Sequence, residues 1–236
     1  MRTHLMTVLK TAVPFVLLLL CAACNDVVEV TGMSSIVPLE GRMLYLCAYA
    51  DEDLKAIDSC RVQDGHFAFR IQTDSVMMVH LFVGNESLMP MVLDASELSV
   101  ILTDEEHRVT GSAMNDSLFA FIRLKNTLEA QMHELPHRET RMILNGLEQA
   151  AIAEQLEAEM RVIKAQEDLL VMNFIKQNMD NVMGAGVFMI VTSSFPYPIL
   201  NPQIDELAAE GTTFFLSDAY VSTYLAKARE NMNRLH

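Results

Sequence analysis

The chain has 236 residues, of which 51% are hydrophobic, and 31 acidic side chains against 17 Lys and Arg give it a formal charge of -14. Proteins bind nucleic acid through clustered Lys and Arg, and this sequence has no such cluster, so nucleic acid is excluded as the expected partner. Direct docking on anionic lipid headgroups is disfavoured for the same reason. The length suffices to bury a core in one or two domains.

The first segment has the layout of a bacterial export signal. The stretch from Met1 to Lys10 contains Arg2 and no acid, and an apolar run of 11 residues, Val13 to Ala23, follows it. A helix that spans a bilayer needs about 20 residues, so a cleaved signal peptide is favoured over a permanent transmembrane helix.

The end of this segment predicts lipidation. Ala22 and Ala23 precede Cys24 as in a lipobox, the motif after which a lipid-modified cysteine becomes the first residue. Cys21 occupies a position of the lipobox at which leucine is commoner. Cys21 is not the expected lipidation site itself, because cleavage before it would require the bulky Leu20 immediately before the cut. Cys21 and Cys24 also have CxxC spacing, yet cleavage would separate the two sulfurs, so a redox site is not expected there.

We therefore predict a signal peptide over residues 1–23 and palmitate or a similar acyl chain on Cys24. The mature chain would carry 15 basic and 31 acidic side chains, a formal charge of -16. Its partner would be a membrane, reached through the lipid, and its expected location is the cell envelope, on the periplasmic or surface face of the outer membrane.

Residues 24–111 are predicted to form an antiparallel β-sandwich or open barrel. Short apolar or alternating runs are separated by turn residues at regular spacing. The clearest hairpin is centred on Asp64-Gly65, which tolerates positive φ angles, and it places Phe67, Phe69 and Ile71 on one sheet face. The eight expected strands are Val27–Val30, Arg42–Tyr49, Ala56–Val62, His66–Ile71, Val76–Val83, Met89–Leu93, Glu97–Leu102 and Arg108–Thr110.

Residues 112–236 are predicted to be helical, which makes the fold class α+β. Asn115 is the expected cap of a first helix, and Pro136 is expected to interrupt it. A longer helix follows, in which Glu157 is placed to pair with Arg161. The run Met183–Val191 is expected to be buried, and further helices begin near Pro202 and Ser217. The apolar stripe of the longer helix consists of Ile152, Leu156, Met160, Ile163, Leu170 and Phe174.

Two stretches resemble a known family. The run from Ala56 to Phe69 has an "I-D-S" strand, a "D-G" turn and an "F-x-F" strand, and Val109-Thr110-Gly111-Ser112 with Asn115 looks like "v-x-G-S-x-x-N". This order resembles the domain of unknown function at the N-terminus of thioredoxin-like lipoproteins of Bacteroidetes-type bacteria. No CxxC follows in this sequence, so the oxidoreductase activity of those lipoproteins is not expected to carry over.

One short motif suggests a metal site. His133, Glu134 and His137 fit HExxH, in which two histidines on one helical face hold zinc while the glutamate activates water. Pro136 opposes that helical geometry, so a helix end with exposed polar residues is preferred. We predict that the chain uses no metal or other cofactor, and a zinc-dependent hydrolase ranks last among the possible functions.

The remaining thiols, Cys47 and Cys60, lie on two neighbouring predicted strands. If the connecting turn is centred between Asp53 and Leu54, the two cysteines face each other and a disulfide is possible in an oxidising compartment. Two separate buried thiols are the favoured alternative.

Three functions are therefore ranked. The first is a non-catalytic envelope lipoprotein that binds a protein or small ligand or supports an assembly. The second is an accessory to thiol-disulfide chemistry that acts with a separate thioredoxin-like partner. The third is the hydrolase at His133, Glu134 and His137.

Overall fold

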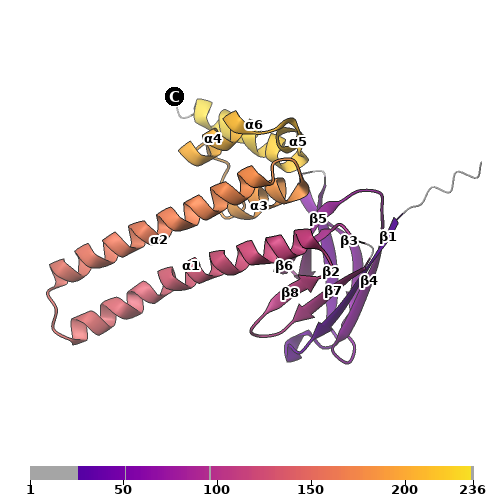
Figure 1. The fold of residues 1–236 in the computed structure, drawn as a ribbon, viewed down its shortest axis with the longest axis horizontal. Helices are drawn as coiled ribbons and strands as arrows, with labels where there is room; N and C mark the ends of the chain where they lie inside the picture. The colour runs from indigo at the N-terminus through magenta and orange to yellow at the C-terminus, as the bar shows by residue number, and fades with distance from the viewer. Residues whose placement is uncertain (1–25, 51, 96, 235–236) are drawn as a thin grey trace, which may run out of the picture.

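The computed structural model describes residues 26–50, 52–95 and 97–234, which form a β-sandwich followed by helices (Figure 1). Each of the eight predicted strands is confirmed, and so is the α+β class. The strands are β1 (Asp26–Ser34), β2 (Met43–Ala50), β3 (Asp53–Arg61), β4 (His66–Thr73), β5 (Met77–Val83), β6 (Glu86–Leu93), β7 (Glu97–Leu102) and β8 (His107–Thr110).

The strands form two four-stranded sheets, ordered β4-β1-β7-β8 and β3-β2-β5-β6. Alternation of side chains buries Phe67, Phe69 and Ile71 on one face of β4, as predicted. The purely antiparallel arrangement that we predicted is wrong at one position, because β1 pairs parallel with β7. Between these two strands the chain crosses to the second sheet for β2 and β3, returns for β4, which pairs antiparallel with β1, and crosses again for β5 and β6.

The predicted tight turn at Asp64-Gly65 is confirmed. Both residues have positive φ, 51° and 72°, and the flanking Gln63 and His66 exchange two backbone hydrogen bonds of 2.9 Å. The strands on either side then diverge into different sheets, so the turn is a corner of the sandwich rather than the end of a long hairpin. The carboxylate of Glu40 accepts hydrogen bonds from the backbone N–H groups of Asp64 and Gly65.

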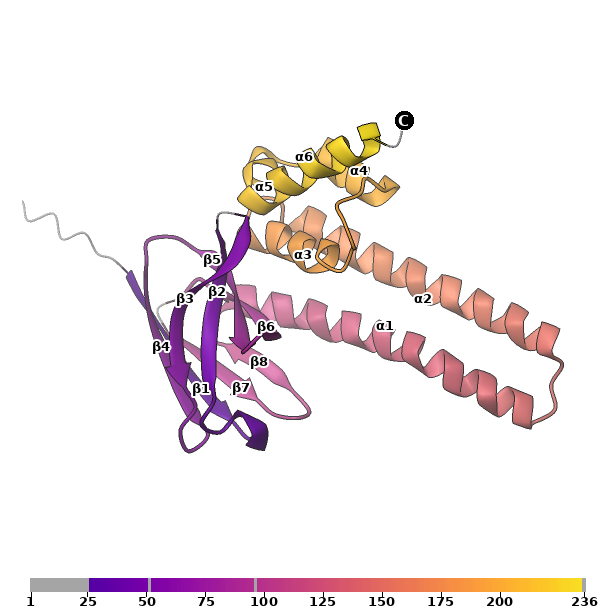
Figure 2. The ribbon, with the colours of Figure 1, turned by 180° about the vertical axis from the view of Figure 1, so that it is seen from behind.

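Six helices follow the strands in the described part of the chain. The two longest, α1 and α2, form an antiparallel hairpin that projects far beyond the sandwich (Figure 1). The others pack beside its base and against the outer face of the β3-β2-β5-β6 sheet, as the reverse view in Figure 2 shows. The bounds are α1 (Ala113–Leu144), α2 (Gln149–Gln177), α3 (Val182–Thr192), α4 (Pro202–Glu210), α5 (Thr213–Ser217) and α6 (Ala219–Arg234).

Two predictions for α1 are wrong. Pro136 does not end the helix, which continues through it to Leu144. The neighbouring Leu135 is buried against α2, and this packing outweighs the loss of one backbone hydrogen bond. The cap is Ser112, whose Oγ accepts a hydrogen bond from the backbone N–H of Asn115. The Asn115 side chain is engaged elsewhere, with β6.

The apolar stripe of α2 is narrower than predicted. Ile152, Leu156, Ile163 and Phe174 are buried, but Met160 is 44% exposed. Among the described elements, α1 is the one that covers this part of α2, and a single helix covers a narrow strip, so Met160 lies outside the contact. The predicted ion pair of Glu157 with Arg161 is present, with 3.8 Å between Oε2 and Nη1. Most of α3 is buried, as expected for Met183–Val191.

Candidate functional site

Cys24, the predicted site of lipidation, lies outside the described residues, and so does the predicted signal peptide. Among the helices of residues 26–234 that the structure describes, none has the length and apolar character needed to cross a membrane.

Cys47 and Cys60 are not opposite each other. The register of β2 and β3 places Cys47 opposite Ala56 and Cys60 opposite Leu44, and both thiols are free. Cys60 packs against the sandwich core. Cys47 lies between two core-facing residues, Leu46 and Ala48, so its side chain points to the outer face of the sheet. The symmetric pairing that would allow a disulfide is therefore wrong.

The environment of both cysteines also opposes thiol chemistry. Burial raises the pKa of the Cys60 thiol to about 11, and burial raises the pKa of Cys47 as well. The nucleophile in disulfide exchange is the thiolate, and reactive cysteines have a lowered pKa. Near neutral pH these two side chains are protonated thiols.

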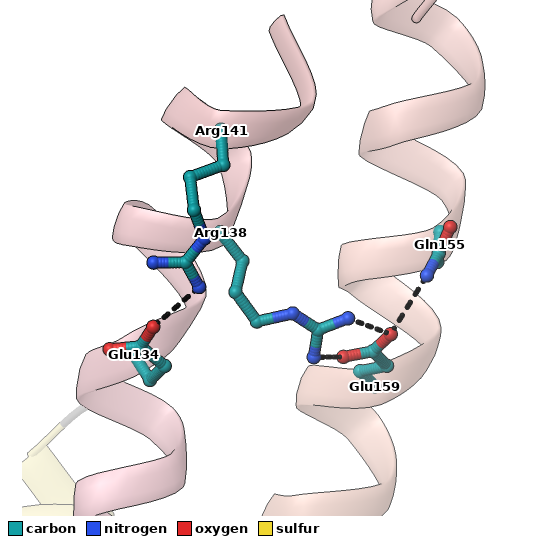
Figure 3. Close-up of polar contacts among 5 residues, drawn as sticks. All are labelled: Glu134, Arg138, Arg141, Gln155 and Glu159. Atoms are coloured by element: carbon teal, nitrogen blue, oxygen red, sulfur yellow. Dashed lines mark hydrogen bonds and ion pairs between the residues drawn. The ribbon is translucent and has the colours of Figure 1, made fainter. Parts of the chain in front are cut away.

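The HExxH residues lie on a continuous helix, because Pro136 does not interrupt α1. His133, Glu134 and His137 are all exposed. Glu134 accepts a hydrogen bond of 2.6 Å from Arg141 of the same helix, and this bond lowers the pKa of the Glu134 carboxyl (Figure 3). Within the described ranges, no group of three or more His, Cys, Asp or Glu side chains could hold a metal ion. Among the described residues, the motif therefore has no third protein ligand for a metal ion. Its glutamate, Glu134, is hydrogen-bonded to Arg141 instead.

A larger feature, which the sequence patterns did not reveal, is a cavity of about 600 Å³ between α1, α2, α3 and α4. We call it the helical cavity. It lies where α3 and α4 cover the base of the hairpin, the arrangement visible in Figure 1. Its floor is apolar, and the floor side chains are buried; they include Val171, Ile175, Phe188, Ile204 and Leu207.

The floor of the helical cavity is held by aromatic packing behind it. The Phe188 ring meets Phe215 and Tyr224 edge to face, with ring centroids 5.6 and 5.2 Å apart. The hydroxyl of Thr192 donates a 2.7 Å hydrogen bond to the carbonyl of Phe188 and is 2.9 Å from the Tyr220 hydroxyl. These contacts join α3 to α5 and α6 behind the floor.

Charged side chains of α1 and α2 form one rim of the helical cavity. Lys125 pairs with Glu129 and with Glu167, the latter at 3.3 Å between Nζ and Oε1, and Lys164 lies 3.7 Å from Asp168. Burial lowers the pKa of Lys125, but hydrogen bonds to the two glutamates outweigh this effect, so its pKa is raised. Lys125 is therefore a permanent cation, and the rim has three carboxylates against two ammonium groups.

The helical cavity combines an apolar floor with a charged rim, which is the composition of a site for an amphipathic ligand. Sequence analysis did not identify it because its lining residues come from four helices between Lys125 and Leu207. The available signal was indirect: the run Met183–Val191 is apolar on all sides, which indicates that other helices cover it.

Comparison with known families agrees with the resemblance seen in the sequence. Residues 28–118 match the model described as "Domain of unknown function (DUF4369)", so the sandwich and the first turns of α1 carry that domain. No curated protein and no solved structure matches the chain. Every residue that lines the helical cavity follows the matched range, so the cavity is an addition of the helical region to this domain.

Proposed function

We propose that this protein is a non-catalytic lipoprotein of the cell envelope, held on a membrane by lipid on Cys24, whose helical region binds an amphipathic ligand. The observation that carries the binding role is the helical cavity, which has an apolar floor and a charged rim. An enzyme would need a nucleophile, a base or a metal beside such a cavity. The lining residues include two lysines, three acids and no His or Cys, and all five charged groups are already engaged in ion pairs with one another.

The chemistry of the lining indicates the class of ligand. Aliphatic and aromatic floor residues suit an acyl chain or a hydrophobic side chain of a peptide. The rim has one more negative than positive group, so a cationic or zwitterionic head is favoured over a polyanion. An outer-leaflet amphiphile or a short basic-apolar segment of another protein has this character.

Two neighbouring serines offer a matched test of ligand binding. Ser194 lines the helical cavity and Ser193 does not, yet both are exposed and both donate a hydrogen bond to the carbonyl three residues earlier. We expect Ser194→Trp to weaken binding of a zwitterionic amphiphile that carries a fluorescent acyl chain, because the indole would occupy the mouth. Ser193→Trp should bind it as the unchanged chain does. Equal affinity of all three proteins, or no binding to any, would contradict the proposed role.

The anchor is tested separately by metabolic labelling with radioactive palmitate. We expect the unchanged protein to incorporate label and to sediment with membranes. The Cys24→Ser variant should lose the label and be released from the membrane fraction, whereas Cys60→Ser should keep both properties. Labelling that persists in Cys24→Ser would show that the lipid is attached to another residue and would contradict the proposed anchor.

A further inference from the structure

The proposed lipid anchor lies next to the first strand of the sandwich. A single residue, Asn25, separates Cys24 from Asp26, where β1 begins. Successive Cα atoms are ~3.8 Å apart, so the Cα atom of Cys24 lies at most ~7.6 Å from that of Asp26. A lipid on Cys24 would therefore keep the start of β1 close to the surface of the bilayer.

The start of β1 is in turn fixed relative to the rest of the sandwich. β1 is a central strand of its sheet, paired with β4 on one side and with β7 on the other. Val28 and Val30, near its first residue, are buried in the core of the sandwich. The lipid would thus hold one defined end of the sandwich at the membrane, because no long linker lies between them.

This end of the sandwich has an apolar hollow. In one sheet Asp26 of β1 pairs with Thr73 of β4, and in the other Met77 of β5 pairs with Leu93 of β6. A hollow of about 380 Å³ opens between the two sheets there, and Val76 beside it is 46% exposed. We call this surface the anchor end, and it consists of Val27, Thr73, Asp74, Ser75, Val76, Asp94 and Ala95.

The α1–α2 hairpin points to the opposite side of the molecule. Along the longest axis of the described chain, β1 begins near one extreme and the loop between α1 and α2 lies at the other, as both views show (Figures 1 and 2). The 32 residues of α1 alone rise ~48 Å. A membrane at the anchor end therefore lies far from the tip of the hairpin.

The charges indicate which lipids suit the anchor end. The chain carries a formal charge of -14, so anionic headgroups repel most of its surface. At the anchor end, Asp94 accepts a 2.7 Å hydrogen bond from Ser112, whereas Asp74 is exposed. The ammonium group of a zwitterionic headgroup can pair with Asp74, and the exposed Val76 adds apolar contact at the interface.

We propose that the anchor end is the membrane-facing surface of this protein, that it rests on zwitterionic lipid headgroups, and that the α1–α2 hairpin projects away from the bilayer. This orientation rests on the proposed lipid at Cys24. It presents the loop between the two helices to the aqueous compartment.

Quenching of a fluorophore by labelled headgroups tests the orientation. The full-length lipidated chain, with Cys47→Ser and Cys60→Ser, is placed in vesicles of phosphatidylethanolamine and phosphatidylcholine whose headgroups carry a nitroxide quencher. One introduced cysteine carries the fluorophore. Val76→Cys places it at the anchor end, Val37→Cys places it beyond the other end of β1, ~26 Å along the strand, and Leu144→Cys places it at the hairpin tip. All three side chains are exposed.

We expect quenching at position 76 to be several-fold stronger than at positions 37 and 144. Equal quenching at the three positions, or the strongest quenching at 37 or 144, would overturn the orientation while the anchor stands. Failure of the unchanged chain to float with the vesicles would instead overturn the anchor, and the orientation with it.

The choice of headgroup is tested in the same vesicles. Replacement of phosphatidylcholine by the anionic phosphatidylglycerol should weaken quenching at position 76, because Asp74 is then repelled. Asp74→Lys should restore it. Quenching that does not respond to the anionic lipid would contradict the preference for zwitterionic headgroups.

Discussion

Asn115 is the residue that joins the sandwich to the helices. It is fully buried, its Oδ1 accepts a 2.9 Å hydrogen bond from the backbone N–H of Val92, and its Nδ2 donates one of 2.8 Å to the carbonyl of the same residue. Val92 lies on β6, the edge strand of its sheet, so the amide of Asn115 takes the place of a neighbouring strand. Ser112, which caps α1, also donates to Asp94 and fixes the start of the helix beside this edge.

Substitution of Asn115 should therefore be costly. Asn115→Ala leaves a buried donor and a buried acceptor of Val92 without partners, and we expect the free energy of unfolding to fall by about 2–4 kcal/mol. Asn126→Ala on the same helix is the control, because Asn126 is exposed and should cost less than about 0.5 kcal/mol. Urea denaturation measures both values. A loss for Asn115→Ala no larger than that of the control would show that Val92 does not depend on this amide.

His80 is a second buried polar residue at this seam. It lies on β5 opposite Cys47 and Pro90, it is 7% exposed, and its Nε2 makes no hydrogen bond to any residue the structure describes. Burial lowers the pKa of His80 from 6.5 to about 4. The folded protein therefore holds a neutral imidazole at a pH where the unfolded chain is already protonated.

This difference predicts a pH dependence of stability. Between pH 6.5 and pH 4 the unfolded state binds a proton that the folded state does not, so the contribution of His80 is complete above pH 6.5 and is lost as the pH falls towards 4. We expect His80→Leu to remove about 2 kcal/mol of the stability loss that the unchanged chain shows between pH 7.5 and pH 5. His66→Leu, at an exposed position, should leave that loss in place. Identical pH profiles of the His80 variant and the unchanged chain would refute this account.

Among the elements, α1 shows how packing can override a local signal. Pro136 cannot donate the backbone hydrogen bond to Met132, and proline inside a helix costs about 3 kcal/mol relative to alanine. The helix nevertheless continues, since Leu128 and Met132 before the proline and Leu135 and Met142 around it pack against α2. The same burial that forms the hairpin thus tolerates a residue that would end an isolated helix.

This account predicts that Pro136→Ala stabilises the protein. The alanine restores the hydrogen bond and removes the clash, while the greater freedom of the unfolded chain offsets part of the gain, so we expect an increase of about 2 kcal/mol. Pro202→Ala is the control, because Pro202 occupies the first turn of α4, where proline is tolerated and no such gain arises. Denaturant titration followed by helical circular dichroism measures the change. A less stable Pro136→Ala protein would show that the proline itself is required for the α1–α2 packing.

At the scale of the whole molecule, the helical region covers one outer face of the sandwich and forms a second core there. Val92 of β6 belongs to the same buried cluster as Phe121 of α1 and Phe188 of α3. The sulfur of Met78 on β5 packs directly over Gly186 of α3, where any side chain would collide with it.

The sequence alone determined the local structure: eight strands, the turn at Asp64-Gly65, the two long helices and the buried run Met183–Val191. Alternation, helical periodicity and turn chemistry act over a few residues, so they can be recognised without knowing what packs against them. Only the tertiary structure decided that β1 pairs with β7, that Cys47 and Cys60 point to opposite faces, that Pro136 stays helical and that four helices enclose a cavity. Each of these depends on which segments distant in the chain meet, and no local pattern encodes that choice.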